Sequence, residues 1–192
     1  MSPLPSEDCR ALLALARRVI TESVQQGRAP EAGEVASASL AKPCGAFVTL
    51  RSHGRLRGCI GRVEAVEPLA QTVAFCAVSA ALCDPRFPPL RPDELDEIEI
   101  EISVLSPVEP ITPERIEVGV HGLRVTSGRL RGVLLPHVAT QYRWDRERFL
   151  EETCVKAGLP REAAKDPQTQ IEAFTAQVFS ESDFAASKKR AS

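Results

Sequence analysis

Cys59 has the surroundings best suited to chemistry in this sequence, because glycines and arginines lie on both sides of it. The segment reads Arg55-Leu-Arg-Gly-Cys-Ile-Gly-Arg62. Nearby guanidinium charge, as on Arg57, favours the nucleophilic thiolate over the thiol. Glycines at a turn can expose backbone N–H groups that bind anions. The segment therefore predicts a nucleophilic or redox-active thiol at a glycine turn, where Arg57, Gly58 and Gly61 bind a small anionic ligand.

Other polar residues are candidate partners for this thiol. Asp84-Pro-Arg86 follows an apolar helical pattern, and Asp84 or Arg86 could orient or bind a substrate. Alternatively, Asp84 simply ends a helix before proline and pairs with Arg86. His121 is the histidine that we would test as a base for Cys59. No Cys-x-x-Cys pair occurs among the six cysteines, and none of the three histidines has a metal-motif spacing, so we expect no metal and no cofactor.

Cys59 also has a structural interpretation, since free cysteines are among the most buried residue types. The arginines would then pair with the glutamates of 97–101, and the chain would be a non-catalytic binding module for a protein partner. RNA is a less favoured partner because the aromatic content of 5% offers few stacking platforms. An inert Cys59→Ser variant would favour the binding module over the enzyme.

Length and composition limit the class of protein. A chain of 192 residues with 43% apolar and 26% charged residues fits one domain, or two intimate subdomains, with a sizeable core. The net charge of −2 gives no general attraction to nucleic acid or membrane. The sequence lacks an apolar run of about 18 residues and a basic segment leading into an apolar core. We therefore expect a cytoplasmic protein.

Helical periodicity occurs in three long segments. The first begins near Ser6 and ends at Gly27, the second runs from Pro68 to Asp84, and the third runs from Asp145 to Gly158. Their apolar stripes include cysteines that we expect to be buried, namely Cys76, Cys83 and Cys154. Residues 28–43, rich in Ala, Ser, Gly and Pro, predict a long loop.

Extended patterns complete the chain. Residues 47–50 and 55–57 predict a hairpin, and strict alternation over 97–105 predicts a strand with buried Ile and Val and wetter Glu. Residues 171–179 predict a late strand. Gly-Arg-Leu-Arg-Gly occurs at 54–58 and again at 128–132, which predicts two hairpins of similar shape, with Val133 in the second at the place of Cys59.

The segment Leu56-Arg-Gly-Cys-Ile-Gly61 resembles the signature hexapeptide of the AMMECR domain family. Further matching motifs occur in order over about residues 7–180, at 45–50, 84–89, 99–107, 121–123, 132–136, 138–140 and 144–159. The chain departs from the family pattern at His137, where Gln is usual, and at Gln141-Tyr-Arg143, where Glu-Tyr-Gly is usual. The missing Glu removes one residue that could have served as a base.

The resemblance implies an α+β fold, with two interleaved subdomains around mainly antiparallel β-sheet and about three longer helices. It implies a single domain over residues 1–186, followed by a polar tail at 187–192 that we expect to be disordered. It also implies association with a Memo-type protein and a radical SAM enzyme. The resemblance does not specify a reaction.

Overall fold

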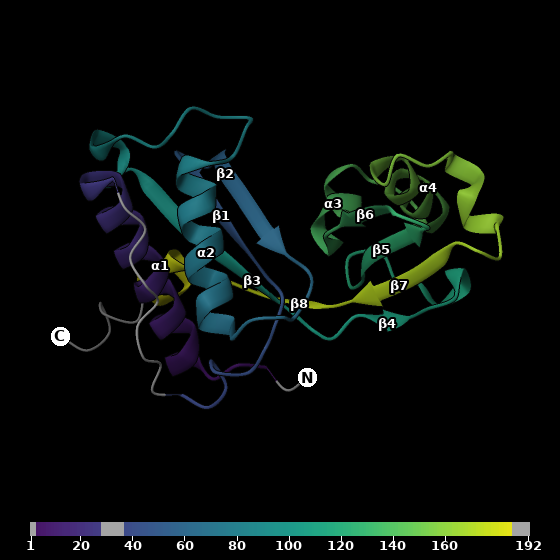
Figure 1. The fold of residues 1–192 in the computed structure, drawn as a ribbon, viewed down its shortest axis with the longest axis horizontal. Coiled ribbons are helices and arrows are strands. Elements are labelled where there is room, and N and C mark those ends of the chain that lie inside the picture. The colour runs from purple at the N-terminus through teal and green to yellow at the C-terminus, as the bar shows by residue number, and fades with distance from the viewer. Residues whose placement is uncertain (1–2, 28–36, 186–192) are drawn as a thin grey trace. The chain divides into compact units, whose positions relative to one another are not determined.

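The computed structural model describes residues 3–27 and 37–185. The chain forms two compact units, Met1–Leu105 with Gln177–Ser192 and Ser106–Ala176. Each unit has its own four-stranded sheet (Figure 1). Because the second unit is inserted between two segments of the first, the units are interleaved along the chain. The fold is α+β, as the resemblance implies.

The first unit packs two long helices on one face of a sheet with strand order β2-β1-β3-β8 (Figure 1). Its elements are α1 (Ser6–Gln26), β1 (Ala46–Ser52), β2 (Arg55–Arg62), α2 (Leu69–Leu82), η1 (Pro92–Glu94), β3 (Ile98–Leu105), β8 (Ala176–Ser180) and α5 (Glu181–Ala185). Val48, Leu50, Ile100 and Ile102 contribute alternate strand residues to its core, and each is fully buried.

The second unit packs α4 (Arg146–Lys156) against an antiparallel sheet with strand order β4-β7-β5-β6. Its other elements are β4 (Glu109–Pro110), η2 (Pro113–Arg115), β5 (Gly122–Ser127), β6 (Leu130–Leu134), α3 (Pro136–Gln141), η3 (Arg161–Lys165) and β7 (Gln170–Phe174). Phe149 and Cys154 of α4 meet Leu123 and Val125 of β5 in a small core of its own.

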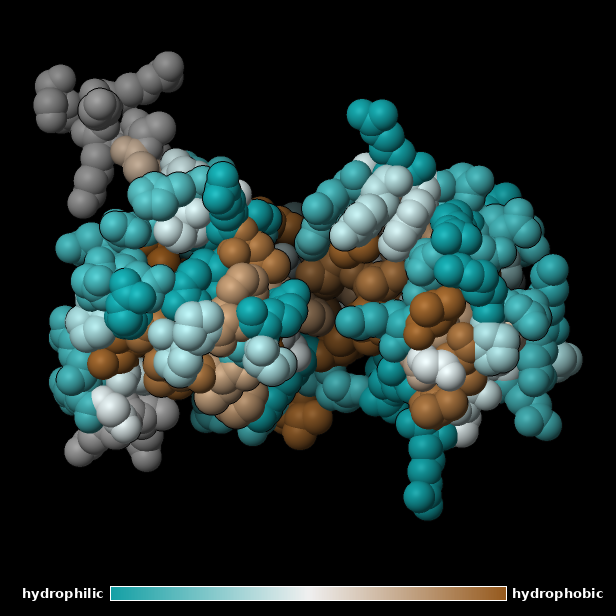
Figure 2. Space-filling view, turned by 90° about the horizontal axis from the view of Figure 1, so that it is seen from above, coloured by the Kyte–Doolittle hydropathy of each residue, from teal (hydrophilic) through white to brown (hydrophobic). Residues whose placement is uncertain are grey.

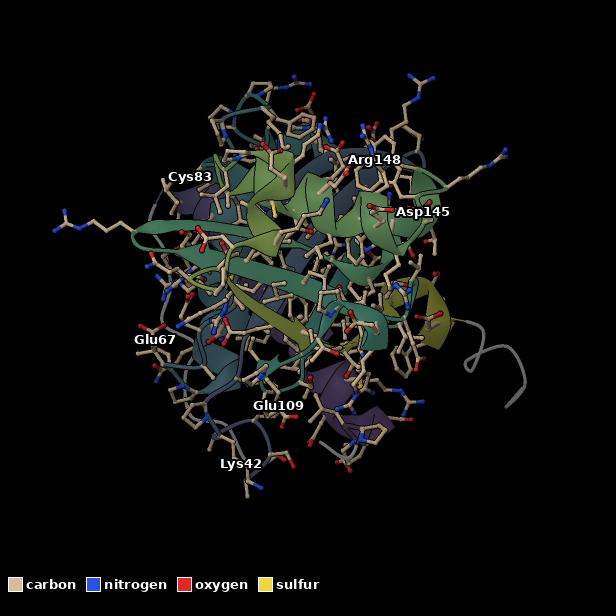
Figure 3. All side chains as sticks on the ribbon, turned by 90° about the vertical axis from the view of Figure 1, so that its right-hand side faces the viewer. Lys42, Glu67, Cys83, Glu109, Asp145 and Arg148 are labelled. Carbon is tan, nitrogen blue, oxygen red and sulfur yellow. The ribbon has the colours of Figure 1, made fainter. Side chains whose placement is uncertain are left out.

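Most of the predicted elements are confirmed. Gly27 ends α1 with a positive φ of 69°, and its N–H bonds to the carbonyl of Ser23. Asp145 caps α4 by accepting a hydrogen bond from the backbone N–H of Arg148 at 2.8 Å, and both residues lie at the start of that helix (Figure 3). On β3, Ile98, Ile100, Ile102 and Val104 are buried, whereas Glu99 and Glu101 are half-buried.

Three sequence predictions are wrong. The late strand is two strands, β7 and β8, in different sheets, and they are separated at Thr175, whose N–H bonds to Ser106 Oγ at 2.9 Å. Cys83 is exposed, because it follows the last residue of α2 and its φ of −127° takes it out of helical conformation. β2 continues through both Gly58 and Gly61, so the expected glycine turn is absent.

Two predictions fall partly or wholly outside the described residues. Residues 28–36 of the expected long loop are not described, while 37–43 contain turns and an isolated bridge between Pro43 and Pro68. The expected tail at 187–192 lies outside the described residues as well.

Both copies of the repeated pentapeptide form hairpins with two-residue loops, closed by the pairs Ser52↔Arg55 and Ser127↔Leu130. In the first loop, φ is positive at His53 (50°) and Gly54 (75°), as in the turns that suit the twist of a hairpin. The register of β1 against β2 then shifts between Leu50 and Arg51. The register of β5 against β6 in the second hairpin has no such bulge.

The exposed apolar side chains described in the first unit include Val66, which is 77% exposed, and Phe75, which is 45% exposed. Figure 2 shows hydrophilic residues over much of the visible face of this unit, interrupted by smaller hydrophobic areas. Over the described residues, no helix combines the length and apolar character that a membrane crossing requires.

Candidate functional site

Cys59 lies on β2, on the sheet face opposite to α1 and α2. A Cβ built on the preceding Gly58 would point at α2 and lie 2.2 Å from the carbonyl oxygen of Ala80. The next residue, Ile60, packs against the same helix-covered core. Because successive side chains of a strand point to opposite faces, the thiol of Cys59 points away from the helices. It is half-buried.

Thr49 is the polar neighbour of this sulfur on the adjacent strand. Thr49 and Cys59 are paired between β1 and β2, and the Thr49 hydroxyl donates to Cys59 Sγ at 3.3 Å. A hydrogen bond donated to the sulfur stabilises its charged form. Glu101 of β3 pairs with Thr49 from the other side, so the three residues form one row across the sheet.

Asp84 and Arg86 cap the edge of β2 at Cys59. The sheet ends at β2, so the backbone groups of this strand that face away from β1 have no strand to bind. The Cys59 N–H donates to Asp84 Oδ2 at 2.8 Å, and Arg86 Nη2 donates to the Cys59 carbonyl at 3.2 Å. The two side chains thus take the place of a neighbouring strand and fix the backbone that carries the thiol.

Asp84 is a buried carboxylate with a complete set of donors. Besides Cys59, it accepts bonds from the Arg86 backbone N–H at 3.1 Å and from Arg86 Nε at 2.9 Å and Nη2 at 2.7 Å. The side-chain hydrogen bond from Arg86 is the largest of the effects that hold the pKa of Asp84 well below its usual range. Asp84 is therefore ionised at neutral pH and keeps Arg86 in place.

Arg86, and not Arg57, is the arginine bound to Cys59, since its Nη2 donates to the Cys59 carbonyl at 3.2 Å. The pKa of Arg86 is raised first by its hydrogen bond to Asp84, and also, to a smaller extent, by its interaction with Cys59. Its side chain is 54% exposed, so the guanidinium can still meet a ligand from solvent.

Arg57 is used in the fold instead. Its guanidinium binds Glu94 of η1 at 2.7 Å and the carbonyl of Pro88 at 3.0 Å, and its side chain is only 12% exposed. At the bulge Arg57 is paired with no residue of β1, which interrupts the alternation that would place it beside Cys59. The sequence-based expectation that Arg57 and Cys59 share a face depends on an unbroken strand.

The two glycines of the hexapeptide have packing partners on both faces of the sheet. Gly58 allows α2 to approach β2 closely, since a Cβ there would collide with Ala80. At Gly61 a Cβ would lie 2.1 Å from the ring of Phe47, so that ring covers the glycine. The need for glycine at both positions follows from these contacts.

The remaining cysteines have different surroundings. Burial raises the pKa of the thiols of Cys9, Cys44 and Cys154, and raises that of Cys76 to about 12. Cys83 is exposed, and no hydrogen bond from its thiol to another described residue is found. Among the cysteines, Cys59 alone combines access to solvent with a donor to its sulfur within the described part of the chain.

His121 belongs to the second unit, where its Nδ1 accepts the backbone N–H of Glu117 at 3.0 Å. In residues 3–27 and 37–185, no group of three or more His, Cys, Asp or Glu side chains is arranged to hold a metal ion.

Sequence reasoning brought together Cys59, Asp84 and Arg86, and the structure places these three in contact. It did not find Thr49 or Glu94. Counting strand pairs back from the hairpin loop could have suggested a partner for Cys59. If the pairing continued without a bulge from Ser52↔Arg55, however, Thr49 would pair with Gly58. The bulge moves the pairing by one residue, to Cys59.

Comparison with known proteins gives a consistent result. The AMMECR1 family model matches residues 13–179. A protein of Methanothermobacter thermautotrophicus is 44% identical over 187 residues, which cover 94% of this chain and 97% of that protein. Protein TK0174 of Thermococcus kodakarensis is 42% identical over 181 residues, which cover 88% of each.

A solved structure shares the fold. The crystal structure of uncharacterized protein PH0010 from Pyrococcus horikoshii matches with a TM-score of 0.83 and 40% identity, over 88% of this chain and 89% of that one. The motifs, the two four-stranded sheets and these similarities lead to one conclusion, which is that the chain belongs to the AMMECR1 family.

Proposed function

We propose that this protein is an enzyme subunit in which Cys59 is the nucleophile and Arg86 binds a small anionic substrate beside it. The observation that carries this proposal is the environment of the sulfur. The sulfur lies on the sheet face opposite to α1 and α2 and receives a hydrogen bond from Thr49, and the half-exposed Arg86 guanidinium bonds to the carbonyl of the same cysteine. These are the features that make a cysteine reactive.

Each residue then has a defined role. Thr49 donates a hydrogen bond to the sulfur and Arg86 binds the anionic substrate, while Asp84 positions Arg86 and holds the Cys59 backbone through its N–H. The thiolate, having lost its proton to solvent, supplies the electron pair for a bond to an electrophilic carbon. The group displaced from that carbon leaves with the electrons of the bond that breaks. We assign anion binding to Arg86, in place of Gly58 and Gly61, which the sequence suggested.

Family membership supports the further proposal that the protein acts in the cytoplasm with a Memo-type protein and a radical SAM enzyme. Deletion strains that lack each gene singly should then show the same metabolic change. Different changes in the three strains would contradict a shared pathway.

A non-catalytic binding module is the second candidate function, and one observation favours it. Packing and ion pairing already account for Arg57, Gly58 and Gly61 of the hexapeptide without any ligand. In this case Cys59 is a structural residue, and the surface of the first unit recognises a protein partner.

The alkylation rate of Cys59 separates the two functions. We would measure iodoacetamide labelling of the native protein at pH 7 by mass spectrometry. Arg86→Gln and Thr49→Val should each slow the labelling of Cys59 by about two- to fivefold, the size expected for a partly exposed interaction. Arg57→Gln removes an equal charge that is bound to Glu94, and it serves as the matched control. Equal labelling rates in all variants would contradict the proposal that Cys59 is the nucleophile.

Activity in the cell requires a second measurement, because a reactive thiol need not be used. A deletion strain would be complemented with the unmodified gene, with Cys59→Ala, or with Cys83→Ala as the control for an exposed cysteine. The metabolite profile of the Cys59→Ala strain should match the deletion. A profile that matches the unmodified gene would favour the binding module.

A further inference from the structure

The second unit contains a cavity that shares no lining residue with the thiol site. It has a volume of about 500 Å³ and is formed by η2, η3 and the amino-terminal half of α4. This volume is in the range of sites for small organic ligands. All of its lining residues belong to residues 106–176, so the cavity is complete within one unit.

The walls of the cavity are fixed by polar contacts. Arg146 Nη1 of α4 donates to the carbonyl of Glu114 on η2 at 2.7 Å. On the other side, Arg161 of η3 pairs with Glu152 and Glu151 of α4. The hydrogen bond to Glu152 is the main reason that the pKa of Arg161 is raised. The cavity is therefore shaped before any ligand arrives, which lowers the entropy lost on binding.

Apolar groups and charges of both signs line this space. Leu150, which is 7% exposed, together with Pro113 and Ala164, provides apolar surface. The lining also includes three cationic and four anionic side chains, a formal net charge of −1. A lining with so little excess of either sign does not select a simple anion or a simple cation.

Three of these charges have no partner among the described residues. Glu147, Glu162 and Lys165 are exposed, and no hydrogen bond or ion pair from their charged groups to another described residue is found. Arg161, by contrast, is already held by glutamates. Carboxylates and an ammonium are thus available to a ligand on the edge of a preformed cavity that also offers the apolar surface of Leu150.

We propose that this cavity binds a small zwitterion of dipeptide size with apolar side chains. Its ammonium group is bound by Glu147 and Glu162, its carboxylate by Lys165, and its side chains by Leu150. Hydrogen bonds to charged groups are the stronger class, so the two ends supply the selectivity. This site is independent of the function proposed for Cys59.

Isothermal titration with leucyl-leucine tests the proposal on the full chain. Binding should be saturable with one site per chain. Glu147→Gln and Lys165→Gln should each weaken it about tenfold, as expected for loss of a hydrogen bond to a charged group. Glu117→Gln and Lys156→Gln are controls of the same chemistry outside the lining, and they should bind as the unmodified protein does.

A modified ligand gives a second test without any change to the protein. Leucyl-leucine with an acetylated amino terminus and an amidated carboxyl terminus keeps the apolar groups but has no charge. It should bind at least tenfold more weakly than the free dipeptide. Lack of saturable binding by the free dipeptide, or equal affinity for the blocked one, would overturn the proposal.

Discussion

Replacing Asp84 by Asn tests whether the Asp84–Arg86 pair holds the edge of β2. The amide keeps the size of the carboxylate but turns one acceptor oxygen into a donor. If Oδ2 is replaced, the N–H of Cys59 and Nη2 of Arg86 both face an NH₂ group. If Oδ1 is replaced, the backbone N–H and Nε of Arg86 do so. Either orientation loses two hydrogen bonds to a charged acceptor.

The expected loss follows from the exposure of the two partners. Breaking a buried ion pair destabilises a protein by about 3–5 kcal/mol. The Asp84 side chain is 2% exposed, but Arg86 is 54% exposed and can regain water. We therefore expect Asp84→Asn to lower the free energy of unfolding by about 2–3 kcal/mol.

The assay must report on the first unit. Trp144 belongs to the second unit, so tryptophan fluorescence would follow the other sheet. Pulse alkylation of Cys76 in increasing urea is suitable, because this thiol is 0% exposed in the folded protein. Asp93→Asn is the matched control, since Asp93 and Arg91 form a pair of the same type with side chains that are 69% and 65% exposed.

The control should change the free energy of unfolding by less than about 0.5 kcal/mol. An equally small change for Asp84→Asn would refute the role of the pair at the strand edge. The pH dependence gives a further check. Because the folded pKa of Asp84 is depressed, its contribution is complete above the unfolded value of about 3.9 and is lost as the pH falls below it. The difference between the unmodified protein and Asp84→Asn should therefore shrink as the pH falls below about 4.

The other predictions concern packing. Ile100 is fully buried on β3, so Ile100→Ala should lower the free energy of unfolding by about 2–5 kcal/mol, and a loss below about 0.5 kcal/mol would exclude it from the core. Gly58→Ala should destabilise the first unit by about 2 kcal/mol or more, since its Cβ would lie 2.2 Å from the Ala80 oxygen, and a neutral result would contradict the close approach of α2. In native buffer Cys83 should react with iodoacetamide while Cys76 and Cys154 stay protected until unfolding, so rapid native labelling of either buried thiol would disprove its placement.

Periodicity along the chain predicts the layers of this fold well. Ile98, Ile100 and Ile102 alternate with glutamates, and burial on one face follows directly from that pattern. Leu69, Val73, Cys76 and Ala80 follow helical spacing, and all are buried on α2. Such patterns depend only on which face a residue occupies, and this is fixed locally.

Contacts that depend on where an element ends were not predictable in this way. Cys83 continues the spacing of the α2 stripe but lies one residue beyond the helix. The run 171–179 has uniform β character, yet Thr175 separates two strands of different sheets. Asp84-Pro85 marks the end of α2 only to within about two residues, and the uniform composition of 171–179 does not mark the break at Thr175.

The repeated pentapeptide explains why the candidate site was only partly predicted. In both hairpins the last glycine lies under a helix, since a Cβ on Gly58 would meet Ala80 and one on Gly132 would meet the backbone of Ala157 and Thr153. The shared residues therefore serve the same packing between strand and helix.

The difference between the copies lies in the loop. It occupies residues 53–54 in the first hairpin but 128–129 in the second, so Gly54 is the second loop residue and Gly128 the first. The first loop thus lies one residue earlier in the repeat than the second, and the bulge at Arg57 compensates for this difference. It frees the Arg57 guanidinium to bind Glu94 and pairs Thr49 with Cys59. The arginine nearest to Cys59 in sequence is thus used in the fold, and Arg86, which follows α2, is the arginine that bonds to the Cys59 carbonyl.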